Sequence, residues 1–305
     1  MTADTRSKIG SAWPNPVECT VAVDGIPMSA LFSESEAPRA TIVAIHGGAT
    51  TSAYFDCPGH PPLSLLRLGA RLGFSVIALD RPGFGSSAPH ADEMADPGRR
   101  TELAYRAVDA ILGTGDRGAG VFLVAHSAGC ELALRMAAHP EGSRLLGMEI
   151  AGTGRRHQLA AREVLTRPKL PDIRRGVREL IWQTAHLYPP EVIGGAVRGS
   201  WSPPYEGDVV MNWQKRDFPD LAARVSIPVR FSLADREAFW EAGQAGLTEV
   251  ASMFSASPRV AVNEQRDSGH NLSLCYSAAA YHLGVLSFAE ECVVHANQAV
   301  ASEDR

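Results

Sequence analysis

The sequence predicts an α/β protein built on a mostly parallel sheet with helices on both faces, and three observations support this prediction. Strand-like and helix-like segments alternate along most of the 305 residues. The strand-like segments are near-continuous apolar runs, as expected for strands that are buried on both faces of a parallel sheet. The chain also changes abruptly from strand to helix within VFLVAHSAGCELAL, residues 121–134.

The first half of the chain predicts a hairpin followed by alternating strands and helices. Residues 17–34 read as two strands around the turn dipeptide Asp24-Gly25. After them, buried apolar runs that end in glycine or polar loops alternate with segments of helical spacing. We expect strands in the ranges 40–48, 74–85, 120–125 and 144–152, and helices at 61–72, 102–113 and 128–139.

The composition changes after residue 154. Residues 155–178 hold eight arginines and lysines against only Glu163 and Asp172, and residues 182–213 hold three of the five tryptophans. We interpret residues 155–225 as an insertion between two sheet strands, forming a helical cap. Residues 1–154 and 226–305 are then the two parts of the α/β core. In the second part we expect strands at 227–235 and 259–265, and helices over about 238–254 and 272–294.

Composition excludes several classes of protein. The formal net charge of −5 gives no basic surplus for nucleic acid. The N-terminal residues contain no apolar segment of the kind found in secretory signals, and no apolar run is long enough to span a membrane. The five cysteines are widely spaced and form no CxxC pair, so we expect reduced thiols, no metal site and no cofactor. A cytoplasmic location is the resulting expectation.

The strand-to-helix corner carries a serine between small residues, in Ala125-His126-Ser127-Ala128-Gly129. Such a sharp turn lifts the corner side chain clear of the sheet at the carboxyl ends of the strands, and it needs small neighbours. The next N–H, that of Ala128, then points outward at a helix N-terminus, where it can meet developing negative charge. The alternative is an ordinary βα turn in a Rossmann-like domain.

Three further stretches favour a nucleophilic serine. The loop His46-Gly47-Gly48-Ala49 can supply a second oxyanion donor from Gly48 or Ala49. His270, in a glycine-containing loop after the last strand, can take the proton of Ser127. Asp235 ends a late strand and can orient that imidazole. Taken alone, Asp235 also reads as a helix N-cap, and Asp267 is its nearest rival in sequence. The order serine, acid, histidine is that of one large fold family.

These motifs make the chain resemble the α/β-hydrolase superfamily over residues 17–294. The matching stretches are HGGA at 46–49, DRPGFGSS at 80–87, AHSAG at 125–129, SLAD at 232–235 and SGH at 268–270. The resemblance implies eight strands, a cap after the sixth strand, and catalysis by Ser127, His270 and Asp235. It also implies that Asp80 serves mainly to bind backbone groups. The oxyanion loop reads HGGATT rather than HGGG, so the choice between Gly48 and Ala49 stays open.

A serine nucleophile suits acyl transfer, as in an esterase, thioesterase, lactonase or amidase, whereas related epoxide hydrolases and haloalkane dehalogenases use aspartate at that position. We expect a small, largely apolar ester or thioester as substrate.

The basic run 155–178 is either a solvated helix face or a docking surface for coenzyme A or an acyl carrier protein. Two other classes stay open: a lyase or cofactor-free oxygenase with His270 as base, and a ligand-binding protein without turnover. The predicted substrate-binding residues, with packing in the core as the alternative for the tryptophans, are Trp182, Trp201, Trp213 and His126.

Overall fold

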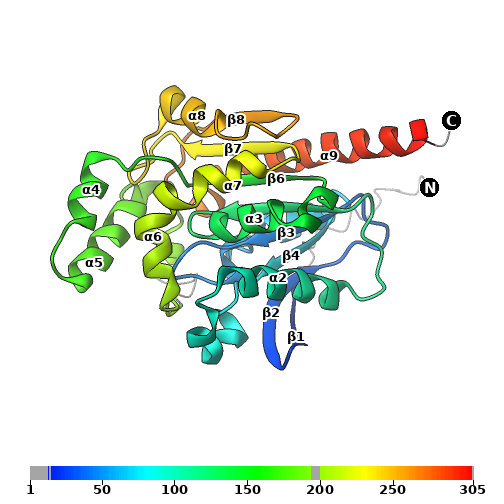
Figure 1. Cartoon of the computed structure of the whole chain (residues 1–305), viewed down its shortest axis with the longest axis horizontal. Helices are drawn as coiled ribbons and strands as arrows, with labels where there is room; N and C mark the ends of the chain where they lie inside the picture. The colour runs from blue at the N-terminus through cyan, green and yellow to red at the C-terminus, as the bar shows by residue number, and fades with distance from the viewer. Residues whose placement is uncertain (1–12, 14, 194–199, 304–305) are drawn as a thin grey trace, which may run out of the picture.

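One eight-stranded sheet forms the centre of the protein, with strand order β1-β2-β4-β3-β5-β6-β7-β8 (Figure 1). The computed structural model describes residues 13, 15–193 and 200–303. β1 and β2 form an antiparallel hairpin and β2 runs antiparallel to β4, whereas the remaining neighbours are parallel. The strands are β1 (Val17–Val23), β2 (Ile26–Ser33), β3 (Thr41–Ile45), β4 (Ser75–Leu79), β5 (Val121–His126), β6 (Gly147–Ala151), β7 (Val229–Ala234) and β8 (Val260–Gln265).

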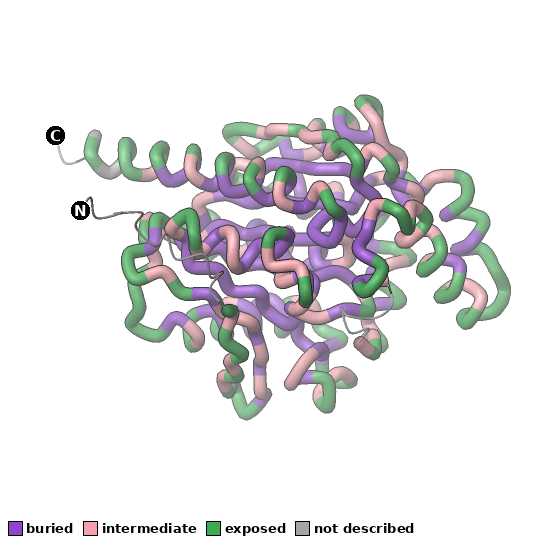
Figure 2. Tube along the Cα trace, turned by 180° about the vertical axis from the view of Figure 1, so that it is seen from behind, coloured by how far each residue is buried: buried purple, intermediate pink, exposed green. Residues whose placement is uncertain are grey.

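Helices cover both faces of the sheet because the parallel strands are apolar on both sides. On β3, Val43 and Ile45 belong to one buried cluster, and Ile42 and Ala44 belong to a second. Residues of α2, α3, α7 and α8 pack in the first cluster, and residues of α1 and α9 pack in the second. Figure 2 shows the buried chain running through the centre between these two exposed outer layers. The helices are α1 (Leu65–Arg71), α2 (Pro97–Leu112), α3 (Gly129–Ala137), α4 (Leu159–Leu165), α5 (Leu170–Ile181), α6 (Tyr205–Arg216), α7 (Phe218–Arg224), α8 (Gly243–Ala251) and α9 (Ala278–Glu303).

The predicted fold class is therefore confirmed. Several element boundaries differ from those expected, and two of these differences bear on the site. The helix expected over 238–254 begins only at Gly243, because residues 235–242 form a loop that lies at the site described below. The last helix begins at Ala278, after a short 3₁₀ turn at Leu272–Leu274.

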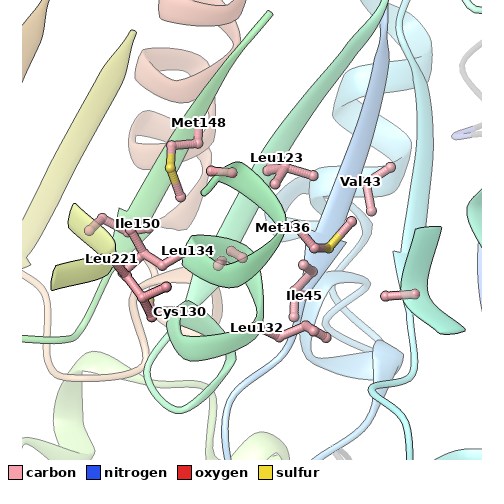
Figure 3. Close-up of a cluster of buried hydrophobic side chains, with 14 of the residues drawn as sticks. Val43, Ile45, Leu123, Cys130, Leu132, Leu134, Met136, Met148, Ile150 and Leu221 are labelled. Atoms are coloured by element: carbon pink, nitrogen blue, oxygen red, sulfur yellow. The ribbon is translucent and has the colours of Figure 1, made fainter. Parts of the chain in front are cut away.

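The insertion between β6 and β7 contains helices α4 to α7, and they lie in two different places. In Figure 1, α4 and α5 project beyond the end of the sheet, whereas α7 lies over the sheet beside α3. Figure 3 shows Leu221 of α7 against Cys130 of α3 and Ile150 of β6. The last part of the range 155–225 thus packs in the main core. Residues 194–199 of that range lie outside the described residues.

Candidate active site

Ser127 stands at a strained corner between β5 and α3. Its φ is +51°, a left-handed conformation that costs a non-glycine residue about 1–3 kcal/mol. Gly129 permits the tight approach of helix to strand, because a Cβ there would lie 2.4 Å from the His46 carbonyl oxygen and 2.6 Å from that of Ile45. Ser127 is partly accessible, while Ala125 before it is fully buried. The corner predicted from the sequence is therefore present.

His270 lies within hydrogen-bond distance of Ser127. The Ser127 hydroxyl and His270 Nε2 are 3.1 Å apart, although the two residues are 143 positions apart in the chain. The His270 ring is buried, and the loop after β8 carries it. With Nε2 unprotonated, the ring accepts the hydroxyl proton, which is the arrangement that a general base requires.

The carboxylate that faces the other ring nitrogen belongs to Glu237. His270 Nδ1 donates to this carboxylate, at 3.1 Å from Oε1 and 3.0 Å from Oε2. Glu237 is buried, and its Oε1 also accepts from the backbone N–H groups of Phe239 and Trp240. Burial raises the pKa of Glu237, but the neighbouring His270 and these hydrogen bonds outweigh burial, so its pKa lies below the ordinary value. The carboxylate is thus held ionised against the ring.

The prediction that Asp235 fills this position is wrong. Asp235 stays at the end of β7, where its N–H donates to the Gln265 carbonyl oxygen and its Oδ1 accepts from the Ser268 N–H at 3.0 Å. The chain then turns, with the Glu237 N–H bonded to the Ala234 carbonyl oxygen. This turn brings Glu237 to the His270 ring, whereas Asp235 binds the backbone of the loop after β8. The rival Asp267 is exposed.

The loop after β3 runs beside the serine. A Cβ on Gly47 would lie 3.1 Å from Ser127 Cβ, so only glycine fits there without displacement. The Gly47 carbonyl oxygen accepts from His46 Nδ1 and from Arg81 Nη2, each at 2.8 Å. Gly48 is half-buried, and Ala49 is exposed with a φ of +53°. Ala128 follows Ser127 in the chain and is the N-cap residue of α3.

A model of a known protein family matches residues 42–281, which is most of the chain, and its description is "Alpha/beta hydrolase family". The chain belongs to the alpha/beta hydrolase family. No curated protein sequence matches it.

Solved structures show the same fold at low sequence identity. An open-form lipase is 18% identical with a TM-score of 0.66, and the match covers 91% of this chain and 99% of the lipase. A thermostable carboxyl esterase from Bacillus coagulans is also 18% identical, with a TM-score of 0.65 and coverage of 92% and 99%. A thioesterase domain from the curacin biosynthetic pathway is 16% identical, with a TM-score of 0.59 and coverage of 90% and 100%. These neighbours share the architecture of the alpha/beta hydrolase family.

His126, predicted to bind substrate, instead packs behind the serine of this alpha/beta hydrolase. Its Nε2–H donates to the backbone carbonyl oxygen of His270 at 2.8 Å, and its ring stacks on Tyr54 with centroids 4.6 Å apart. Burial and the nearby His270 hold the pKa of His126 well below its usual value. The ring is therefore neutral, and it fixes the backbone that carries His270.

The three tryptophans expected around the pocket occupy three different environments. Trp213 is 2% exposed and stacks on Phe218, so its predicted pocket role gives way to packing in the core. Trp201 is 75% exposed and lies beside the Arg174 guanidinium. Trp182 packs edge to face on Tyr188, whose hydroxyl accepts from the Asn271 N–H, next to His270. Of the three, only Trp182 is linked by these contacts to the loop that carries His270.

No group of three or more histidine, cysteine, aspartate or glutamate side chains among the described residues is placed to hold a metal ion. Within the same residues, no helix combines the length and the apolar character needed to cross a bilayer.

Proposed function

We propose that this hydrolase-fold protein cleaves a small ester or thioester through an acyl-enzyme on Ser127. The observation that carries the proposal is the continuous chain of hydrogen bonds from Ser127 through His270 to Glu237. The strained backbone at Ser127 adds support, because strain of this kind persists where a side chain must be held for a function.

In the proposed acylation step, the Ser127 oxygen attacks the carbonyl carbon of the substrate while its proton passes to His270 Nε2. The Glu237 carboxylate stabilises the imidazolium that results and holds the ring in the Nδ1–H tautomer. When the tetrahedral intermediate collapses, the bond to the leaving alkoxide or thiolate breaks. The leaving group takes the proton from His270, and the acyl group stays on Ser127.

In the proposed deacylation step, water attacks the acyl-enzyme and gives its proton to His270. The acid is then released and the Ser127 hydroxyl is restored. In both steps negative charge develops on the former carbonyl oxygen. We assign the stabilising donors to the N–H of Ala128, at the start of α3, and to an N–H of the loop after β3.

The features around the catalytic residues support a largely apolar acyl group. The Phe239 ring lies 6.3 Å from the His270 ring, and Tyr54 stacks on His126 beside it. We assign the projecting pair α4 and α5 as the cap over this end of the sheet. An open hollow of about 480 Å³ lies along α5 and the segment after it, and Arg175, Arg178, Glu179 and Trp182 border it. Its two arginines favour a thioester carried by coenzyme A or an acyl carrier protein as the second candidate substrate class, although Glu179 offsets part of their charge.

Labelling with a fluorophosphonate and assay of a matched set of variants test the proposal. Ser127→Ala should lower kcat by about 10⁴-fold or more and abolish labelling, while the fold is retained. Glu237→Gln should lower kcat by about 10²–10⁴-fold, because the amide disfavours the required tautomer of His270. Asp235→Asn is the control, because Asn can still accept from Ser268, and it should keep near-normal activity. Each assay compares an acyl-CoA with an aryl ester of the same acyl group.

Labelling of another residue, or full activity of Ser127→Ala, would refute the serine mechanism. A large loss in Asp235→Asn with none in Glu237→Gln would return the acid role to Asp235. Failure to trap any acyl-enzyme, with catalysis of another reaction that depends on His270, would favour a lyase or an oxygenase. Tight binding without turnover would indicate a ligand-binding protein.

A further inference from the structure

Arg81 is a fully buried arginine that lies next to the serine site but takes no part in the proposed proton transfers. It is 1% exposed and follows Asp80 in the loop after β4. Its backbone N–H donates to His46 Nε2 at 3.1 Å, which leaves His46 Nδ1–H to donate to the Gly47 carbonyl oxygen. One of its side-chain nitrogens, Nη2, donates to the same carbonyl oxygen at 2.8 Å. Arg81 therefore holds the Gly47 carbonyl directly and through His46.

Holding the Gly47 carbonyl also determines where the next N–H points. The peptide bond is planar, and no cis peptide occurs among the described residues. In a trans peptide the C=O and the following N–H point in opposite directions. Since the Gly47 carbonyl points to Arg81 and His46, the Gly48 N–H points away from them. Gly47 itself lies against Ser127.

Arg81 also contacts the carboxylate of Glu206, in the first turn of α6. Nη2 donates to Glu206 Oε1, and both side chains are buried. A Cβ on Gly48 would lie 3.4 Å from Glu206 Oε2, so this carboxylate also flanks the loop after β3. The Tyr205 hydroxyl, one residue earlier, donates to the Pro82 carbonyl oxygen at 2.9 Å. The start of α6 is thus fixed to the loop that carries Arg81.

We infer that Arg81, held by Glu206, is a positioning residue that aims the Gly48 N–H into the oxyanion hole. The inference rests on the proposed serine mechanism, and it selects Gly48 over Ala49 as the second donor. The Ala49 carbonyl oxygen accepts from the Ser200 N–H at 3.0 Å, and its exposed position suits a role in holding the insertion. The ion pair also adds little net charge beside the oxyanion, because the carboxylate balances the guanidinium.

The test compares Arg81→Met with Arg230→Met. Arg230 forms a buried ion pair of the same kind with Glu149, at 2.9 Å, between β7 and β6, without contact to Gly47. Arg81→Met should lower kcat on the order of 10²-fold with little change in KM, because only transition-state binding loses its donor. The inhibition constant of a trifluoromethyl ketone, which forms the tetrahedral adduct, should rise in parallel. Arg230→Met should lower the melting temperature but leave kcat and this inhibition constant near normal.

Two further variants keep the test decisive if Arg81→Met fails to fold. Arg81→Lys keeps the charge and enough donors, but its side chain is one atom shorter than that of arginine and reaches the Gly47 carbonyl less well, so it should regain part of the kcat. Glu206→Gln keeps a hydrogen-bond acceptor and should cause a smaller loss than Arg81→Met. A uniform loss of stability in all these variants, with kcat and inhibitor binding unchanged, would overturn the inference. If wild type resists fluorophosphonate and Ser127→Ala stays active, the serine mechanism itself has failed.

Discussion

The two halves of the insertion between β6 and β7 are attached to the protein in different ways. The pair α6 and α7 is stacked together through Trp213 and Phe218, whose rings are 4.4 Å apart. It is held to the core by the buried pair of Glu206 with Arg81 and by a partly buried bond of 3.0 Å from Arg135 of α3 to Asp217. On α5 only Gly176 is fully buried. The pair α4 and α5 packs mainly on itself, beyond the end of the sheet (Figure 1).

The pair α4 and α5 meets the site through its two ends. Gln158, which caps α4, donates to the Glu237 carbonyl oxygen at 2.6 Å. Asn271, next to His270, donates to the carbonyl oxygen of Ile181 at the end of α5 at 3.1 Å. The anchored half, α6 and α7, thus packs beside the loop after β3, whereas the projecting half, α4 and α5, is bonded to the loops that carry Glu237 and His270. The comparison teaches that one insertion combines a part that packs in the main core with a part that meets the site mainly at its two ends.

The largest effect expected from this comparison is on stability, in the anchored half. Trp213→Ala should lower the free energy of unfolding by about 3–5 kcal/mol, because it removes a large buried ring from the core. Trp201→Ala is the matched control in the same insertion, and it should change that free energy by less than about 0.5 kcal/mol because its ring is exposed. Urea unfolding of both variants measures the difference. Equal losses would show that the burial of Trp213 is not what stabilises the anchored half.

A smaller and local effect is expected where α4 meets α5. A Cβ on Gly176 would lie 2.7 Å from Val164 Cγ1, so Gly176→Ala should push the two helices apart. Hydrogen exchange of residues 159–181 should then rise, with little change in global unfolding. Val164→Ala in the same chain should restore protection by removing the clashing methyl groups.

Gly207→Ala provides the control for this substitution in the anchored half. Gly207 lies within α6, and nothing lies within 4 Å of the position of its Cβ, so alanine should stabilise the protein by about 0.5–1 kcal/mol through helix propensity. If Gly176→Ala also stabilised the protein and left exchange of 159–181 unchanged, the close packing of α4 on α5 would not constrain the cap.

A further effect concerns pH at the base of the projecting half. His157 precedes α4 and stacks on Trp240 at 4.3 Å, and burial, with help from Lys215 and Arg162, lowers its pKa to about 4. The pKa of a histidine in the unfolded chain is about 6.5. At pH values between about 6.5 and about 4, the His157 side chain therefore binds more protons in the unfolded chain than in the folded one. The contribution of neutral His157 to the free energy of unfolding is therefore fully present above about pH 6.5, and it is lost as the pH falls toward 4.

His157→Phe should keep the stacking and remove this part of the pH dependence. The measurement is the melting temperature of wild type and variant between pH 7.5 and pH 4.5, with the exposed His295→Gln as control. Parallel curves for wild type and His157→Phe would show that His157 does not contribute.

The sequence predicted the sheet and the serine corner well because both depend on local patterns. Apolar runs that are buried on both faces mark the strands, and the small residues around Ser127 are required by the turn itself. His270 was found because it follows the last strand. These features can be read from neighbouring residues, without knowledge of distant contacts.

The acid and the aromatic residues could not be assigned in this way. Asp235 and Glu237 lie two positions apart in one loop, and the turn that selects Glu237 depends on bonds from Asp235 to Gln265 and Ser268. The only signal in the sequence was a second carboxylate within the same loop. Likewise, aromatic content alone did not separate a buried Trp213 from an exposed Trp201, because the difference comes from packing such as the stack of Trp213 on Phe218 of α7.

The hydrogen bond between Ser127 and His270 joins residues 143 positions apart, and this separation has a consequence for the newly synthesised chain. A ribosome-bound chain that has exposed the serine corner still lacks Glu237 and His270, which lie later in the sequence. Under the proposed mechanism, Ser127 stays unactivated until β7, β8 and the loops after them have left the exit tunnel and joined the sheet. Enzymatic activity would then report on completed folding of the whole domain.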